Sequence, residues 1–116
     1  MRNRRSNCPV ACTLDLVGDR WTLLVVRDLI WGKTRFDEFL ASPEGIATNI
    51  LSSRLRLLED LGYVTGKKDA SDRRRIHYSL TKKGERLGKL LRGIVKWGLK
   101  NLPETKLQPV TKDENR

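Results

Sequence analysis

The chain has 116 residues, of which 38% are hydrophobic and 33% are charged, and its formal net charge is +10. These values fit one small domain with a thin core, which favours stabilisation by pairing with a second copy. The positive charge favours a polyanion as partner, nucleic acid above all, with an anionic membrane or simple solubility as alternatives. No apolar run is long enough to span a membrane, and residues 1–5 lack an apolar signal segment behind them. We therefore expect a cytoplasmic protein.

The first half of the chain predicts helices. Residues 1–7 are polar and basic and are expected to form a flexible arm. Pro9 suits the first turn of a helix that runs to about Gly18. Over residues 20–31 apolar side chains cover most of the helical circumference, so this second helix should be the buried centre of the domain, and Gly32 should end it.

A short third helix and a longer fourth helix follow. Thr34 is the expected N-cap of the third, with Asp37 in the reciprocal position of a capping box. This helix should end near Pro43, because the residue before a proline avoids helical geometry. The fourth helix is expected over residues 47–61, with Gly62 as its C-terminal stop. Two helices joined by a short turn are typical of a helix-turn-helix motif.

The remaining segments predict a hairpin and a last helix. Residues 63–65 indicate a strand, residues 66–75 a polar and basic loop, and residues 75–80 a second strand in which apolar and polar side chains alternate. Thr81 should cap a final helix that reaches residue 102.

The order of these elements predicts a mostly helical α+β fold, a winged helix-turn-helix with a two-stranded β-hairpin as its wing. We expect one domain over residues 8–102, preceded by the arm of residues 1–7. Residues 103–116 are polar and are expected to be disordered.

One face of the fourth helix suits the major groove of DNA. Leu51, Leu55 and Leu58 fall on one side of a helical wheel. The opposite side carries Asn49, Ser52, Ser53, Arg56 and Asp60. Short polar side chains let the backbone approach the bases, and Asn and Arg can donate to adenine and guanine edges. The alternative is an ordinary solvated face. Arg54 projects from the apolar side and should be structural, either snorkelling to solvent or paired with a carboxylate such as Glu59 or Asp28.

The loop over residues 66–75 holds five cations and two anions. At a hairpin tip such side chains can straddle phosphates or reach into a minor groove. The alternative is a solvated turn in which Asp69 and Asp72 pair with the arginines. The candidate DNA-contacting residues are Arg35, Thr48, Asn49, Ser52, Ser53, Arg56, Lys67, Lys68, Arg73, Arg74 and Arg75.

Several short segments, in order, carry a resemblance to a known family. They are residues 8–10 (Cys-Pro-Val), 14–18 (Leu-Asp-Leu-Val-Gly), 20–21 (Arg-Trp), 35–39 (Arg-Phe-Asp-Glu-Phe), 46–58, 62–64 (Gly-Tyr-Val) and 78–81 (Tyr-Ser-Leu-Thr) with Gly84. With these segments the sequence resembles the HxlR-type winged-helix regulators of bacteria and archaea over roughly residues 8–100. Arg73 and Arg74 stand where that family usually has two prolines, so the wing is more similar to that of MarR-type regulators.

The resemblance implies DNA-binding homodimers that recognise a two-fold symmetric, palindromic operator, with the N-terminal and C-terminal helices forming the dimer interface. The final helix fits this role, because Gly84, Gly88, Gly93 and Gly98 lower its intrinsic helicity and make packing partners necessary. The alternative is that this helix only covers its own core.

Cys8 is a candidate redox sensor. It precedes Pro9 at a helix N-terminus and lies near arginines at positions 2, 4 and 5, and such a field stabilises a thiolate. The resemblance implies a redox or aldehyde sensor that pairs across the dimer, whereas the alternative is a small buried hydrophobe. A disulfide from Cys8 to Cys12 within one helix would constrain little, so a sensing bridge should join subunits.

No set of residues typical of catalysis is apparent, so we expect a protein that is not an enzyme and needs no cofactor. Cys8 and Cys12 with the distant His77 make a poor zinc site, because closed sites need four ligands. The sequence thus predicts a double-stranded-DNA-binding transcriptional regulator that acts as a homodimer and reads a specific operator. Its small-molecule effector is not indicated. The alternatives are a winged-helix module that binds protein or RNA, and a nonspecific chromatin-like protein.

Overall fold

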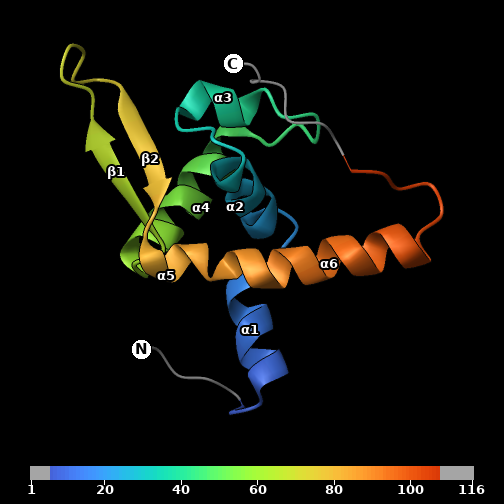
Figure 1. Ribbon diagram of the computed structural model, residues 1–116. Coiled ribbons are helices and arrows are strands. Elements are labelled where there is room, and N and C mark those ends of the chain that lie inside the picture. The colour runs from blue at the N-terminus through green and yellow to red at the C-terminus, as the bar shows by residue number, and fades with distance from the viewer. Residues whose placement is uncertain (1–5, 108–116) are drawn as a thin grey trace.

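In the computed structural model, which describes residues 6–107, a two-stranded hairpin projects from one side of a group of helices (Figure 1). In chain order the elements are α1 (Pro9–Val17), α2 (Thr22–Ile30), α3 (Phe36–Leu40), α4 (Thr48–Asp60), β1 (Val64–Lys68), β2 (Ile76–Leu80), α5 (Lys82–Glu85) and α6 (Leu87–Asn101). The predicted fold class is confirmed: a mostly helical α+β domain in which a helix-turn-helix is followed by a β-hairpin.

The core lies where α2, α3, α4 and β1 meet. Its buried side chains are Val25, Val26, Leu29, Phe39, Ile46, Leu51, Leu55, Leu58 and Val64. The expected central role of α2 is confirmed, as is the burial of the leucine side of α4. Gly62 follows α4 with a φ of 85°, a conformation that glycine adopts without strain and that ends the helix.

The hairpin is longer than the sequence indicated. β1 pairs with β2 in antiparallel register, Val64 opposite Leu80 and Lys68 opposite Ile76, so the first strand extends to residue 68 and the connecting loop shrinks. The segment before α3 joins the edge of this sheet: the backbone N–H of Tyr78 donates to the carbonyl of Thr34 over 2.7 Å. The start of the helix-turn-helix is therefore fixed to the hairpin.

The predicted capping box of α3 was wrong. The N-cap is Arg35 rather than Thr34, and the reciprocal acceptor is Glu38 rather than Asp37. The Glu38 carboxylate accepts the backbone N–H groups of Thr34 and Arg35 over 2.9 and 3.0 Å. Glu38 is the third residue after the true N-cap, Arg35. Its side chain is longer than that of an aspartate and reaches the backbone N–H of the N-cap.

The C-terminal helix is interrupted once. Thr81 caps it as expected, accepting the N–H of Gly84 over 3.0 Å, but a turn at Arg86 divides it into α5 and α6. Gly84 is required here, because a Cβ at this position would lie 2.0 Å from the carbonyl oxygen of Tyr63. α6 then crosses α2, with Gly88 buried close to Ile30.

α1 and α6 each leave several apolar side chains exposed. α1 extends beneath α6 in Figure 1, and Val17 is its one buried residue. Val10 and Leu14 on α1 are 65% and 58% exposed, and Ile94 and Trp97 on α6 are 47% and 62% exposed. Within residues 6–107, none of the helices has the length and apolar character that crossing a bilayer requires.

Candidate nucleic-acid interface

The polar side of α4 faces solvent. Thr48, Asn49, Ser52, Ser53 and Arg56 are all exposed. On the opposite side Leu51 and Leu58 are fully buried, which fixes the rotation of the helix about its axis. The first turn of α4 also presents backbone N–H groups that no side chain caps, and such groups favour phosphate. α4 therefore offers a narrow, small-residue surface on a rigid support.

Arg54 is structural as expected, but its predicted partners were wrong. Its guanidinium Nη1 lies 3.6 Å from Asp19 Oδ1, and neither Glu59 nor Asp28 takes part. Asp19 also caps α2, accepting the backbone N–H groups of Trp21 and Thr22 over 2.9 and 3.0 Å. The pair thus ties α4 to the junction between α1 and α2.

The Asp19 carboxylate is stabilised in its charged form. Partial burial raises the pKa of Asp19, but hydrogen bonds from the Thr22 hydroxyl and two backbone N–H groups, together with Arg54, leave the pKa below its ordinary value.

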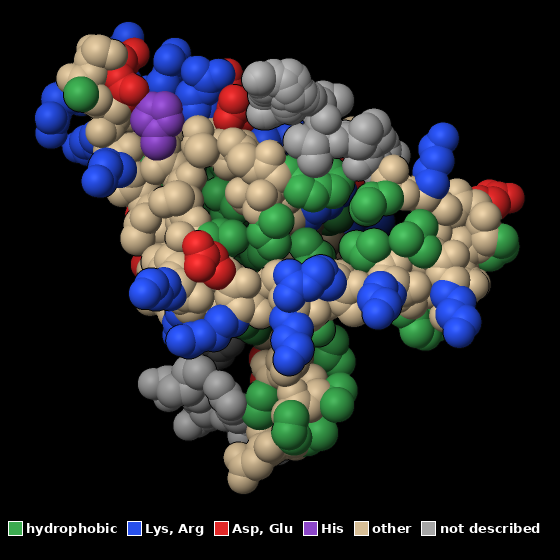
Figure 2. All heavy atoms as spheres, viewed as in Figure 1, with side chains coloured by type: hydrophobic (Ala, Val, Ile, Leu, Met, Phe, Trp, Pro, Cys, Tyr) green, Lys and Arg blue, Asp and Glu red, His purple; other side chains and the backbone are tan. Residues whose placement is uncertain are grey.

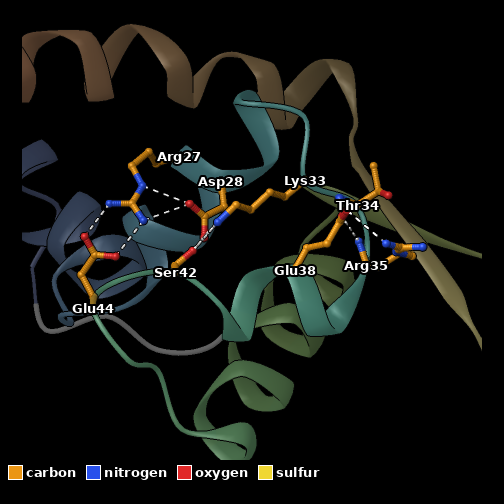
Figure 3. A network of polar contacts seen from close by, with 8 residues as sticks. All are labelled: Arg27, Asp28, Lys33, Thr34, Arg35, Glu38, Ser42 and Glu44. Carbon is orange, nitrogen blue, oxygen red and sulfur yellow. Dashed lines mark hydrogen bonds and ion pairs between the residues drawn. The ribbon is translucent and has the colours of Figure 1, made fainter. Parts of the chain in front are cut away.

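A buried polar network holds the turn between α3 and α4 against α2 (Figure 3). At its centre Asp28 is buried and accepts a hydrogen bond from the Ser42 hydroxyl and two from the Arg27 guanidinium. Arg27 in turn donates to both carboxylate oxygens of Glu44, each over 2.8 Å. The Lys33 ammonium donates to Ser42 over 2.7 Å. This network sets where α4 begins relative to the core.

Arg27 and Glu44 stabilise one another's charged forms. The hydrogen bond from Arg27 lowers the pKa of Glu44, and the bond to Glu44 raises that of Arg27. Sequence patterns alone did not predict this network. The available signal was an aspartate among the apolar residues of α2, which needs partners when buried.

Asp69 organises the hairpin tip. Its Oδ2 accepts the backbone N–H groups of Ser71 and Asp72, each over 2.9 Å, and the Ser71 hydroxyl over 2.7 Å. Its Oδ1 lies 2.8 Å from Nε2 of His77 on β2. The hydrogen bond with the Ser71 side chain has the largest effect on the pKa of Asp69, and the one with His77 the next largest. Together they hold this pKa far below its ordinary value. In the alternative interpretation of this loop both aspartates pair with arginines: Asp72 does pair with Arg74 at 3.3 Å, whereas Asp69 pairs with His77 instead.

The hairpin tip is rich in exposed cations. Lys67, Lys68, Arg73, Arg74 and Arg75 are all exposed. Figure 2 shows Lys and Arg side chains gathered at the hairpin tip. The Arg74 side chain is 92% exposed. Arg35 is more restrained, with Glu38 at 3.4 Å and Asp37 at 3.9 Å. It lines a groove between α3 and the hairpin together with Arg74 and Arg75.

Replacing Asp69 with alanine should loosen the hairpin tip, because the turn loses three hydrogen bonds at once. We expect the amide hydrogens of Ser71 and Asp72 to exchange with solvent severalfold faster, as measured by NMR. Asp72→Ala is the control, since it removes the same charge but leaves Asp69 in place. Unchanged exchange in Asp69→Ala would contradict this role.

The same turn should resist acid. The native pKa of Asp69 lies below that of an unfolded aspartate, so its stabilising contribution is complete above the unfolded pKa. It is lost only as the pH falls towards the native value. Protection of these amides in the wild type should therefore persist at mildly acidic pH.

Cys8 lies at the N-cap of α1 and is exposed, and Cys12 is half-buried one turn later. The backbone N–H groups of Ala11 and Val10 lower the pKa of the Cys8 thiol. Cys12 instead donates its thiol hydrogen to the carbonyl of Ser6 over 3.3 Å. The arginines at positions 2, 4 and 5, which the sequence analysis placed near Cys8, lie outside the described residues. Among residues 6–107 no three His, Cys, Asp or Glu side chains gather in a group that could hold a metal ion.

A family model described as the HxlR-like helix-turn-helix matches residues 16–106. The chain belongs to this family. An HTH-type transcriptional regulator of Mycobacterium tuberculosis (strain CDC 1551 / Oshkosh) is 40% identical over 101 residues, covering 87% of this chain and 63% of that protein. The chain thus spans less than two thirds of the mycobacterial relative's length.

Solved structures of similar proteins share the fold of this HxlR-like chain. The transcription-factor candidate PA1607 superposes with a TM-score of 0.79 at 39% identity, covering 97% of this chain and 80% of that one. The redox regulator HypR in its oxidised form superposes with a TM-score of 0.72 at 34% identity, covering 81% of this chain and 97% of that one. The fold is therefore that of a winged helix-turn-helix, and the family is one of transcriptional regulators rather than of enzymes.

Proposed function

We propose that this HxlR-like chain is a transcriptional regulator that binds double-stranded DNA as a homodimer and recognises a two-fold symmetric operator. The observation that carries the proposal is the exposed, small-residue side of α4 beside a cationic hairpin on the same rigid domain. One element reads base edges, and the other holds the phosphate backbone.

In this proposal α4 enters the major groove from its N-terminal end. Thr48, Asn49 and Ser52 meet the duplex first and allow close approach of the backbone. Arg56, one turn further, donates to guanine O6 and N7. Lys67, Lys68 and the three arginines at the hairpin tip contact phosphates or the minor groove, and Arg35 contacts the backbone at the start of α3.

Dimerisation accounts for the apolar side chains that the monomer exposes. Val10 and Leu14 on α1 and Leu90, Ile94 and Trp97 on α6 would be covered by a second copy. A two-fold axis then places two copies of α4 on successive major grooves, which requires a palindromic site.

Alanine substitution of two arginines separates base reading from backbone binding. Arg56→Ala should lower affinity for the operator by roughly tenfold to a hundredfold and affinity for random duplex much less. Arg74→Ala should weaken binding to the operator and to random duplex alike. The slope of log affinity against log salt should become shallower by about 0.9 for each phosphate contact that is lost. Fluorescence anisotropy against operator and random duplexes measures both. An equal loss on every sequence for Arg56→Ala would contradict a base-reading role for this arginine.

The same titration distinguishes a DNA-binding regulator from a winged-helix module that binds protein or RNA. Such a module would form no complex with any duplex, operator included. Genomic footprinting supplies the operator, and one or a few palindromic sites are expected.

We further propose that Cys8 makes this DNA binding responsive to oxidants or electrophiles. Its exposure and lowered pKa favour the reactive thiolate, and the structurally similar HypR is a redox regulator. Two Cys8 thiols, one from each subunit, would lose two protons and two electrons to an oxidant such as diamide and form a disulfide across the dimer.

Cys8→Ser should abolish a diamide-dependent change in DNA affinity, because serine cannot form the bridge. Non-reducing electrophoresis should show a linked dimer for the wild type and for Cys12→Ser, the matched control. A response to diamide that survives in Cys8→Ser would rule out this thiol.

A further inference from the structure

The C-terminal helices carry more positive charge than the recognition helix and hairpin together. Residues 82–101 contain seven Lys and Arg and one acidic residue, a net +6 of the chain's +10. Residues 48–80 contain seven Lys and Arg but four acidic residues, a net +3. A large part of the chain's positive charge therefore lies outside the proposed DNA surface.

Within α6 these cations form one stripe. Lys89, Arg92, Lys96 and Lys100 follow each other at intervals of three, four and four residues, which places them on one side of the helix. All four are exposed. We call these four residues the α6 stripe. Figure 2 shows Lys and Arg side chains in a row along α6, separate from the cluster at the hairpin tip.

No member of the stripe forms an ion pair within the described part of the chain. The sequence of α6 contains no Asp or Glu. Each ion pair found over residues 6–107 joins other residues. Four unpaired cations on a single helix face repel each other at low ionic strength and favour a polyanion.

The stripe remains available in the proposed dimer. The exposed apolar residues Leu90, Ile94 and Trp97 lie at intervals of four and three residues and occupy a different side of α6. A second copy that covers those side chains leaves the cations at the edge of the interface. The two-fold axis then gives the dimer two such stripes, each on a helix other than the one that reads the operator.

We propose that the α6 stripe binds the phosphate backbone of a second DNA duplex independently of sequence, so that one dimer holds two duplex segments. From Lys89 to Lys100 the stripe rises by about 16 Å, and phosphates follow one another about every 3.4 Å of duplex axis on each strand. Four flexible cations can therefore reach successive phosphates. The stripe itself contains no apolar anchor of the kind that a protein partner would need.

A capture experiment with two duplexes tests this inference. The inference rests on the proposed function in one respect, namely that α4 and the hairpin hold the first duplex. Beads carrying a biotinylated duplex are saturated with dimer and washed. A fluorescent duplex of unrelated sequence is then added at low ionic strength. The wild type should retain this second duplex, and added salt should release it before the first.

Two variants identify the surface. K89Q/R92Q/K96Q/K100Q should bind the first duplex within roughly twofold of the wild type but capture the second at least about tenfold less, because four phosphate contacts are lost. K67Q/K68Q/R73Q/R74Q removes equal charge from the hairpin and should weaken the first complex. If the α6 variant is not folded, K89Q/K96Q/K100Q leaves Arg92 beside Gly88 in place and should show the same selective loss.

The outcomes are separable. Capture of the second duplex by the α6 variant at the wild-type level would overturn the inference, as would an equal loss of both duplexes. A wild-type dimer that binds the first duplex and captures no second one would overturn the inference but leave the proposed function intact. Binding of polyglutamate through the stripe without capture of DNA would assign it to an acidic protein. Failure to bind the first duplex would instead contradict the proposed function.

Discussion

Asp28→Asn should lower the free energy of unfolding by about 3 kcal/mol, close to the lower end of what breaking a buried ion pair costs. Asp28 is buried and holds together Arg27, Ser42 and Lys33. Asparagine keeps the shape but removes the negative charge, so the cations beside it lose their counter-charge. Because Arg27 keeps Glu44, we expect the lower rather than the upper end of the range.

Urea denaturation monitored by circular dichroism measures this loss. Glu44→Gln is the matched control, since it removes a carboxylate from the same network at a partly exposed position and should cost no more than about 1 kcal/mol. If Asp28→Asn unfolded at the same urea concentration as the wild type, the network would not be what holds the turn between α3 and α4.

A change at the exposed face of α6 should have the largest effect on binding. Ile94→Glu puts a charge among apolar side chains that a second copy would cover, so the dimer should dissociate at micromolar concentration. A monomer reads one half-site and loses the avidity of the second, which lowers operator affinity by about a hundredfold or more.

Analytical ultracentrifugation and anisotropy titration measure the two effects. Lys89→Glu makes an acidic substitution on the cationic side of the same helix and should leave the dimer intact. A dimeric Ile94→Glu protein with unchanged operator affinity would place the subunit interface elsewhere.

Local patterns predicted most of the elements of this domain. The spacing of Leu51, Leu55 and Leu58 was sufficient to place α4 and to identify its buried side. The strand over residues 64–68 was underestimated, because Gly66, Lys67 and Lys68 have no strand pattern of their own. They are extended because β2 pairs with them, and that pairing depends on the partner strand rather than on local propensity.

The contacts around the candidate interface were harder to predict. Arg54 clearly needed a carboxylate, but several lay within plausible reach, and the tertiary fold brings Asp19 to it. The bond between Asp28 and Ser42 spans two helices and a turn, which no periodicity reveals. The predicted capping carboxylate of α3, Asp37, is one residue before the observed one, Glu38. Both residues are acidic, and which of them caps the helix depends on where the helix begins.

Titration of a duplex that contains the footprinted operator tests the central claim most directly. The exposed side of α4 and the cationic hairpin should produce a saturable complex at modest ionic strength, with two subunits for each operator. Its affinity should fall steeply with added salt, as expected when several lysines and arginines displace counterions. Absence of any complex under these conditions would show that this surface does not bind DNA.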